Sequence, residues 1–190
     1  DAKHIPIASL GKDTLYVTFG GLSKNYRAPG FRAGWLILSG MKLHAQSYIE
    51  GLTLLASMRL CANVTAQHGI QTALGGYQSI YDLTTSTGRL YKPREYALKR
   101  FKMMDGITCT EPKGALYLFP SIDLSLYDFE DDEDFVYKLL VEKHVLLVAG
   151  SGFNHSDNHH FRIVYLADLD LLEKALDKIE DFLIEHRNYD

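Results

Sequence analysis

Gly20-Gly-Leu-Ser-Lys-Asn-Tyr-Arg-Ala-Pro-Gly-Phe-Arg-Ala-Gly-Trp35 is a polar stretch that connects two short apolar runs, residues 15–19 and 34–38. Both runs are rich in β-branched or aromatic residues and are bounded by glycine, which is typical of buried strands. The connecting stretch is therefore predicted to be a loop. Because it holds one lysine and two arginines within nine residues, it can present several positive charges to an anionic ligand.

The cations of this loop suit two kinds of chemistry. An amine such as that of Lys24, held beside other cations and partly removed from water, gives up its proton more readily. The free amine can then attack a carbonyl and form a Schiff base. The planar guanidinium of Arg32 suits a two-point grip on a phosphate. The alternative is an ordinary basic surface loop.

Arg162 is a second isolated feature, because it stands between Phe161 and Ile163 in an otherwise apolar predicted strand. An unpaired guanidinium is costly to bury, so Arg162 requires an anion. A structural Asp or Glu can supply that anion, and so can the carboxylate of a substrate. The residues alone leave both possibilities open.

Length and composition exclude several classes of protein. The chain has 190 residues, of which 46% are hydrophobic and 23% charged, as expected for a globular protein of one or two domains. Its formal net charge of −4 predicts no nucleic-acid partner, and no apolar run is long enough to span a membrane. The two cysteines lack the spacing of a metal site or a disulfide framework, which favours a cytoplasmic location.

The pattern along the chain indicates a mixed α/β fold. Helices are predicted over about 41–60, 63–75 and 88–104, with another after the acidic run 130–134 and a last one capped by Asp168. Strands are predicted over 106–110, 115–119, 145–148 and 161–166. The composition changes between residues 88 and 106, and the N-terminal part is too small to close a layered core.

Three stretches resemble one family. The motif Ser23-Lys-x-Tyr-Arg-x-x-Gly-x-Arg-x-Gly-Trp35 resembles the cofactor-lysine motif of the class I and II aminotransferases, fold type I enzymes that depend on pyridoxal phosphate. Residues 112–119 resemble the substrate-side strand of that family, and residues 150–163 resemble its terminal arginine motif. Residues 58–63 and 66–78 are most similar to bacterial glutamate–pyruvate (alanine) aminotransferases.

The resemblance implies a role for each candidate residue. Lys24 would form the Schiff base with pyridoxal phosphate and move the proton at the substrate α-carbon. Arg32 and Ser23 would hold the cofactor phosphate. Arg162 would bind the substrate α-carboxylate, and Tyr117 would line the substrate pocket.

A loop before the terminal arginine gathers His155, Asp157, His159 and His160. Imidazole and carboxylate groups are ligands that zinc and other transition metals accept. The aminotransferases that the chain resembles need no metal in this loop. We therefore expect a solvated loop and assign no metal ligand.

The resemblance also implies an architecture. Residues 1–90 would form the C-terminal tail of the large pyridoxal-phosphate-binding domain, and residues 91–190 the small α+β domain. Only 23 residues precede Lys24, whereas the aspartate that pairs with the cofactor nitrogen lies farther upstream in the family. We expect this chain to be the C-terminal portion of a longer enzyme, inactive and without bound cofactor in isolation.

The implied activity is transamination between glutamate and a small 2-oxo acid, with pyruvate giving alanine, in a cytoplasmic homodimer. Two alternatives use the same scaffold: the effector-sensing domain of a transcription regulator, and a lyase that uses the same cofactor. The upstream sequence distinguishes the regulator, which has a winged DNA-binding segment, from the enzyme, which has a short arm that reaches across a dimer.

Overall fold

A computed structural model describes residues 3–189. The chain divides into two compact units, the first ending at Asp82 and the second beginning at Leu83. The domain boundary predicted from the sequence lies at residue 90. The assignment of the two parts to a large and a small domain stays a prediction. None of the helices in the described residues is both long and apolar enough to cross a membrane.

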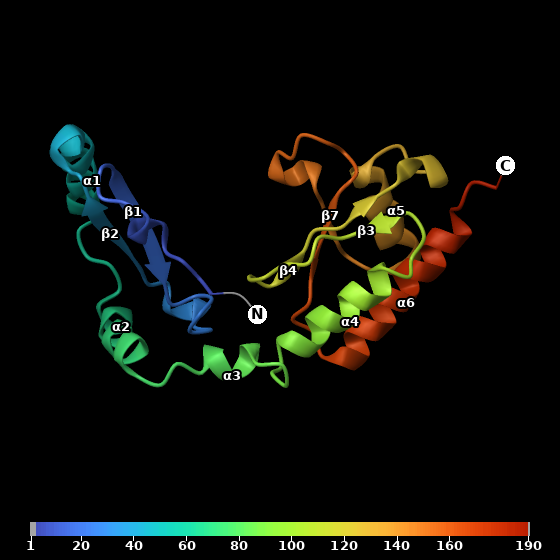
Figure 1. Cartoon of the computed structure of the whole chain (residues 1–190), viewed down its shortest axis with the longest axis horizontal. Coiled ribbons are helices and arrows are strands. Elements are labelled where there is room, and N and C mark those ends of the chain that lie inside the picture. Colours follow the sequence, from blue (N-terminus) through green and yellow to red (C-terminus); the bar gives the residue numbers. More distant parts are fainter. Residues whose placement is uncertain (1–2, 190) are drawn as a thin grey trace. The chain divides into compact units, whose positions relative to one another are not determined.

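The N-terminal unit is built on a β-hairpin (Figure 1). Strands β1 (Leu15–Gly21) and β2 (Gly34–Gly40) pair in antiparallel register, from Leu15 opposite Gly40 to Gly21 opposite Gly34. Both strands begin where the two apolar runs of the sequence begin, so these predicted strands are confirmed.

Two helices follow the hairpin, α1 (Gln46–Arg59) and α2 (Val64–Gly75). Asn63 caps α2, because its side-chain Oδ1 accepts a hydrogen bond from the backbone N–H of Ala66 at 3.0 Å. Both predicted helices are confirmed, although the first begins later than expected. The 3-10 helices of this unit are η1 (Ile7–Ser9), η2 (Pro29–Phe31) and η3 (Leu43–Ala45).

The hairpin strands are not buried, and in this respect the sequence prediction is wrong. Among the described hydrophobic residues of the N-terminal unit, only Leu22 and Ala66 are buried, while Phe19 on β1 is 77% exposed. The apolar runs form strands, but no second layer of this unit covers them. The expectation that this part cannot close a core by itself agrees with that exposure.

The C-terminal unit contains short strands in two antiparallel sheets, one with the order β4–β7–β6 and one that pairs β3 with β5. The strands are β3 (Ile107–Thr108), β4 (Tyr117–Leu118), β5 (Ser121–Ile122), β6 (Val148–Ala149) and β7 (Phe161–Val164). The predicted strand over 145–148 is wrong for residues 145–147. Leu147 is buried in the core, so that apolar run reflects burial rather than strand pairing.

Helix α3 (Ile80–Thr84) crosses the boundary between the two units. The C-terminal unit also contains the helices α4 (Tyr91–Phe101), α5 (Asp132–Lys143) and α6 (Leu169–Glu185) and the 3-10 helices η4 (Leu124–Leu126) and η5 (Ser151–Phe153). Helices α4 and α6 lie side by side (Figure 1). Arg100 of α4 joins them through ion pairs of 2.7 Å to both Asp177 and Glu180 of α6. The predicted cap of α6 is confirmed, because Asp168 Oδ1 accepts from Leu171 N at 2.9 Å.

Aromatic side chains fill the core of this unit. Phe101, Phe135, Phe161 and Phe182 are fully buried. The rings of Phe135 and Phe161 lie 5.1 Å apart, in the range of favourable aromatic contacts. Phe161 opens β7, so the strand that carries Arg162 is anchored directly in the core.

Asp132 is a buried carboxyl that fixes the segment before β7. It is fully buried at the start of α5, where it accepts hydrogen bonds from Ser151 N and Ser151 Oγ, each at 2.8 Å. We expect Asp132→Ala to lower the free energy of unfolding by about 2–3 kcal/mol, because it leaves Ser151 N without its acceptor and Ser151 Oγ with only a long contact of 3.4 Å to Glu133 Oε1. Urea unfolding measures this change. Asp170→Ala removes an exposed acid from the first turn of α6 and should change stability little; an equal loss in both variants would contradict this explanation.

The contacts of His186 predict that the stability of the protein depends on pH. Its Nδ1 lies 2.8 Å from Asp128 Oδ1 and its Nε2 lies 3.0 Å from Glu142 Oε2. Burial by itself lowers the pKa of His186, but the hydrogen bonds to Glu142 and Asp128 outweigh it, so the net pKa is raised above the ordinary 6.5.

A histidine with a raised folded-state pKa stabilises the protein fully below its unfolded pKa, and this contribution disappears as the pH rises through the folded pKa. We therefore expect the melting temperature to fall more between about pH 6 and pH 9 in the wild type than in His186→Gln. Thermal scans at several pH values test this, and parallel curves for the two proteins would refute it.

Candidate functional site

The loop 22–33 joins β1 to β2 and is closed by its own backbone. Leu22 N donates to Ala33 O at 3.0 Å, and Leu22 O accepts from Ala28 N at 3.0 Å. Leu22 itself is only 2% exposed. The loop is therefore anchored at its base, while its polar middle projects from the end of the hairpin.

Gly20 and Trp35 fix the base of this loop. The two residues face each other in the hairpin register. A Cβ at Gly20 would lie 2.3 Å from the indole ring of Trp35, so only glycine allows the ring to lie against β1. The glycine before the loop is thus explained by a close approach of Trp35 within the hairpin.

Lys24 lies on an exposed turn of the loop, where its carbonyl accepts a hydrogen bond from Arg27 N at 3.0 Å. The sequence analysis expected the amine to be partly removed from water, but the side chain is exposed. Within residues 3–189 its amine makes no hydrogen bond or ion pair. Its nitrogen is therefore available for a bond to a ligand.

The two arginines of the loop differ in their contacts. Arg27 is engaged within the unit, because its Nη2 donates to Ser79 Oγ at 2.5 Å. Arg32 Nη1 donates to Pro29 O at 2.7 Å. Both arginines have a left-handed backbone, with φ of 51° at Arg27 and 50° at Arg32, so this conformation does not distinguish them. The rest of the Arg32 guanidinium has no partner in the described part of the chain.

Ser23, Lys24 and Arg32 thus share one loop, as the motif requires. Ser23 is half-buried, and its hydroxyl has no hydrogen bond to any described residue. A cavity of about 500 Å³ beside this loop is lined by residues such as Tyr26, Arg27 and Phe31, but not by those three. Lys24 and Arg32, unlike the half-buried Ser23, are exposed.

Arg162 lies between two aromatic rings in the C-terminal unit. Its guanidinium carbon is 4.7 Å from the centre of the Tyr117 ring and 4.5 Å from that of Phe153. Strand pairing explains the first contact, because Tyr117 on β4 faces Val164 on β7. Phe153, at the end of η5, was not predicted as a site residue. It belongs to the motif 150–163, but no local pattern indicates its contact with Arg162.

The anion that Arg162 requires does not come from the described residues. Its Nε is buried without a hydrogen-bond partner, and none of the described Asp or Glu side chains forms an ion pair with it. A buried N–H without an acceptor is costly, at about 1–3 kcal/mol. Of the two alternatives that the sequence left open, a structural Asp or Glu is not found among the described residues.

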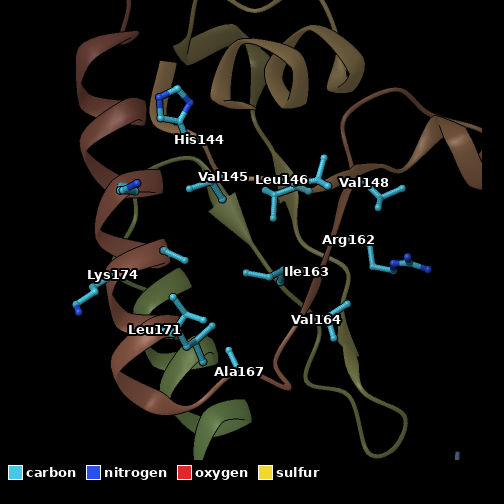
Figure 2. A pocket seen from close by; sticks show the side chains of 14 residues that line it. His144, Val145, Leu146, Val148, Arg162, Ile163, Val164, Ala167, Leu171 and Lys174 are labelled. Carbon is cyan, nitrogen blue, oxygen red and sulfur yellow. The ribbon is translucent and has the colours of Figure 1, made fainter. Parts of the chain in front are cut away.

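A groove of about 450 Å³ lies between α6 and the strands β6 and β7. Figure 2 shows Ile163 pointing toward α6 and Arg162 pointing away from it, as expected for neighbouring residues of a strand. Arg162 borders this groove with its stem, but its guanidinium lies on the opposite side. The mostly apolar groove is therefore distinct from the place where Arg162 would bind an anion.

Comparison with known proteins identifies the class. The family model of the class I and II aminotransferases matches residues 1–179. The chain therefore belongs to the class I and II aminotransferase family, and the prediction from the loop motif is confirmed. The predicted α/β fold is confirmed as well, because solved aminotransferases share this arrangement of helices and strands.

Two relatives of known name and one solved structure show which aminotransferases the chain is similar to. The chain is 52% identical over 183 residues to the glutamate-pyruvate aminotransferase AlaA of Escherichia coli K12, covering 96% of this chain and 45% of that protein. It is 49% identical to the alanine aminotransferase of Mycobacterium tuberculosis H37Rv, covering 98% of this chain and 44% of that protein. A crystal structure of an Escherichia coli aminotransferase superposes with a TM-score of 0.95 at 51% identity, covering 100% of this chain and 47% of that one.

The chain spans less than half the length of these relatives. The narrower resemblance to glutamate–pyruvate aminotransferases, noted in residues 58–63 and 66–78, agrees with the names of two of them.

Proposed function

We propose that this chain is the C-terminal portion of an aminotransferase that exchanges an amino group between glutamate and a small 2-oxo acid, with pyruvate giving alanine. The observation that carries the proposal is Arg162, whose buried Nε has no acceptor in the described structure and whose guanidinium is held between two rings. Amino acids and 2-oxo acids both carry the carboxylate that such a guanidinium binds. Membership of the aminotransferase family supplies the reaction class.

The chemistry of the loop 22–33 fits pyridoxal phosphate. Lys24 offers an amine without a partner in the described chain, which suits an aldehyde, and Arg32 and Ser23 offer donors for a phosphate. Bound pyridoxal phosphate supplies an electron-accepting ring that stabilises negative charge at the substrate α-carbon. Lys24 Nζ would take the proton from that carbon and later return one.

Arg162 and its two neighbouring rings would orient the substrate. A planar guanidinium binds a carboxylate through two parallel N–H donors, which fixes both the position and the rotation of the substrate. The guanidinium lies over the Tyr117 ring at 4.7 Å and over the Phe153 ring at 4.5 Å. These two rings would hold the guanidinium in place while its N–H donors bind the carboxylate.

The assembly is also part of the proposal. Leu54, Leu55 and Met58 of α1 are between 63% and 72% exposed, a larger apolar surface than a soluble helix normally leaves open. We infer a cytoplasmic homodimer in which the remaining chain and a second copy cover this surface, with Arg59 near the partner. Without those parts, the 190-residue chain should be inactive and should not retain pyridoxal phosphate. We propose no nucleic-acid or membrane partner.

The whole protein, including any sequence that flanks this chain, tests the function directly. Incubation with glutamate and pyruvate should yield alanine and 2-oxoglutarate in equal amounts, measured by chromatography of both products. Release of ammonia without an amino acceptor would indicate the lyase instead. Binding of amines without any product would indicate the sensing domain, and either result would overturn the proposal.

A further inference from the structure

A cluster of three metal-binding side chains lies between η5 and β7, apart from the residues assigned above. His155, Asp157 and His160 each offer one ligand atom, and these atoms all lie within 4.8 Å of one another. His155 Nδ1 is 3.2 Å from Asp157 Oδ1, and His160 Nδ1 is 2.6 Å from the same oxygen. Two imidazoles therefore converge on one carboxylate oxygen.

A bound metal ion would set the separation between these ligand atoms. Zinc holds nitrogen and oxygen ligands at about 2.0–2.1 Å in a tetrahedron, which places the ligand atoms roughly 3.3 Å apart. The 3.2 Å between His155 Nδ1 and Asp157 Oδ1 lies near this value. The 2.6 Å between His160 Nδ1 and Asp157 Oδ1 is a hydrogen bond, which a bound ion would replace after side-chain rotations that widen the gap. Two imidazoles with one carboxylate select divalent transition metals over Mg²⁺ or Ca²⁺, which prefer oxygen ligands.

The backbone and an aromatic ring hold His160 in place. Gly150 N donates to His160 O at 2.7 Å, and Phe161 N donates to Pro120 O at 3.0 Å on the following residue. A Cβ at Gly150 would lie 2.7 Å from His160 Cβ, so this close approach requires glycine. The His160 ring stacks on Phe119 with centroids 5.0 Å apart. One ligand is thus preorganised on the core.

The other two ligands remain open to solvent. The side chains of His155 and Asp157 are 38% and 31% exposed, which leaves a path for an ion. His159 Nδ1 lies 3.6 Å from the same Asp157 oxygen but falls outside the group of three. A water molecule can therefore complete the coordination.

We propose that His155, Asp157 and His160 form a binding site for one divalent transition-metal ion of the Zn²⁺ type, with water as a further ligand. This replaces the solvated loop that the sequence analysis expected. The ion ties the loop 155–160 to the end of β7. Because Phe153 precedes this loop and lies on Arg162, the bound ion also stabilises the segment that covers the arginine. Metal binding at this site does not depend on the proposed aminotransferase activity.

Calorimetric titration of the whole protein with Zn²⁺ alone tests the site. We expect saturable binding in the wild type and at least about a tenfold weaker affinity at this site in His155→Ala and in Asp157→Asn, since changes even at partners of metal ligands cost that much. Both side chains are exposed, and circular dichroism checks that the variants fold. His68→Ala, which removes an exposed histidine of α2, should bind as the wild type does. No saturable binding, or equal affinity in all four proteins, would overturn the proposal.

Discussion

Lys24→Ala should abolish transamination by the whole protein, with kcat lowered by at least about a thousandfold. The substitution removes both the amine that bonds the cofactor and the group that moves the proton at the substrate α-carbon, and proton transfer by a positioned side chain contributes about 10²–10⁴-fold. Steady-state kinetics with glutamate and pyruvate measure the loss. The visible absorption of bound cofactor should change in the same variant.

Two further variants distinguish the chemical role of the Lys24 amine from the effect of its positive charge. Lys24→Arg keeps the positive charge of the exposed turn but removes a nucleophilic amine, so it should be as inactive as Lys24→Ala. Lys12→Ala removes another exposed lysine of the same unit and should leave kcat unchanged. Substantial turnover by Lys24→Arg would show that the lysine acts only through its charge, against the assigned role.

Arg162→Lys should lower kcat/KM for glutamate by roughly 10–100-fold, and Arg162→Met by more. Lysine keeps the charge but loses the two-point grip on the carboxylate, and a hydrogen bond to a charged group contributes about 1.5–3 kcal/mol. The rings of Tyr117 and Phe153 also fit a flat guanidinium better than an ammonium group. Kinetics at several glutamate concentrations measure the effect.

An amine substrate that lacks the α-carboxylate provides the control for Arg162. The wild type should prefer glutamate strongly over this amine, and Arg162→Met should lose most of that preference. Lys99→Met removes an exposed cation from α4 of the same unit and should keep it. If Arg162→Met discriminates as well as the wild type, Arg162 does not bind the substrate carboxylate.

Helix α6 shows where sequence reasoning succeeds. Its apolar residues recur every three or four positions from Leu169 onward. Leu169 itself is 39% exposed, but the later residues of the stripe are at most 3% exposed: Leu172, Leu176, Ile179 and Leu183. Asp168 was recognised as its cap because capping depends on the side chain and the next few residues alone. Such local signals predict the helix independently of the elements that pack around it.

The hairpin and the run 145–147 show where such reasoning fails. Leu36 and Ile37 of β2 are 39% and 52% exposed although the run reads as a buried strand. An apolar run indicates that its side chains tend to be buried. Burial, however, requires a second layer of helices or strands, and the local sequence does not say whether that layer is present. The two-residue strand β5 gives too short a pattern to be predicted, whereas β3 lies within the longer run 106–110 that was predicted as a strand.

The candidate site was predictable only in part. The loop motif indicated Ser23, Lys24 and Arg32, because their spacing is local. The position of Arg162 between Tyr117 and Phe153 depends on strand pairing and on the turn at η5, so physical patterns alone left its partner open.

The proposed metal site depends on a backbone conformation that composition does not reveal. Asn154 adopts a left-handed conformation with φ of 57° just before His155. The path of the loop then brings His155 and His160 to Asp157, although the three residues span six positions of sequence. The sequence contains the three side chains, but no metal ligand was predicted from it, because the turn decides whether they converge.

The most direct test of the account locates the cofactor itself. Whole protein loaded with pyridoxal phosphate is treated with borohydride, which fixes the cofactor on the amine that carries it, and then digested for peptide mass spectrometry. We expect the label on the peptide that contains Lys24 and on no other lysine. A label on a different lysine, or no label on a protein that still transaminates, would contradict the central claim.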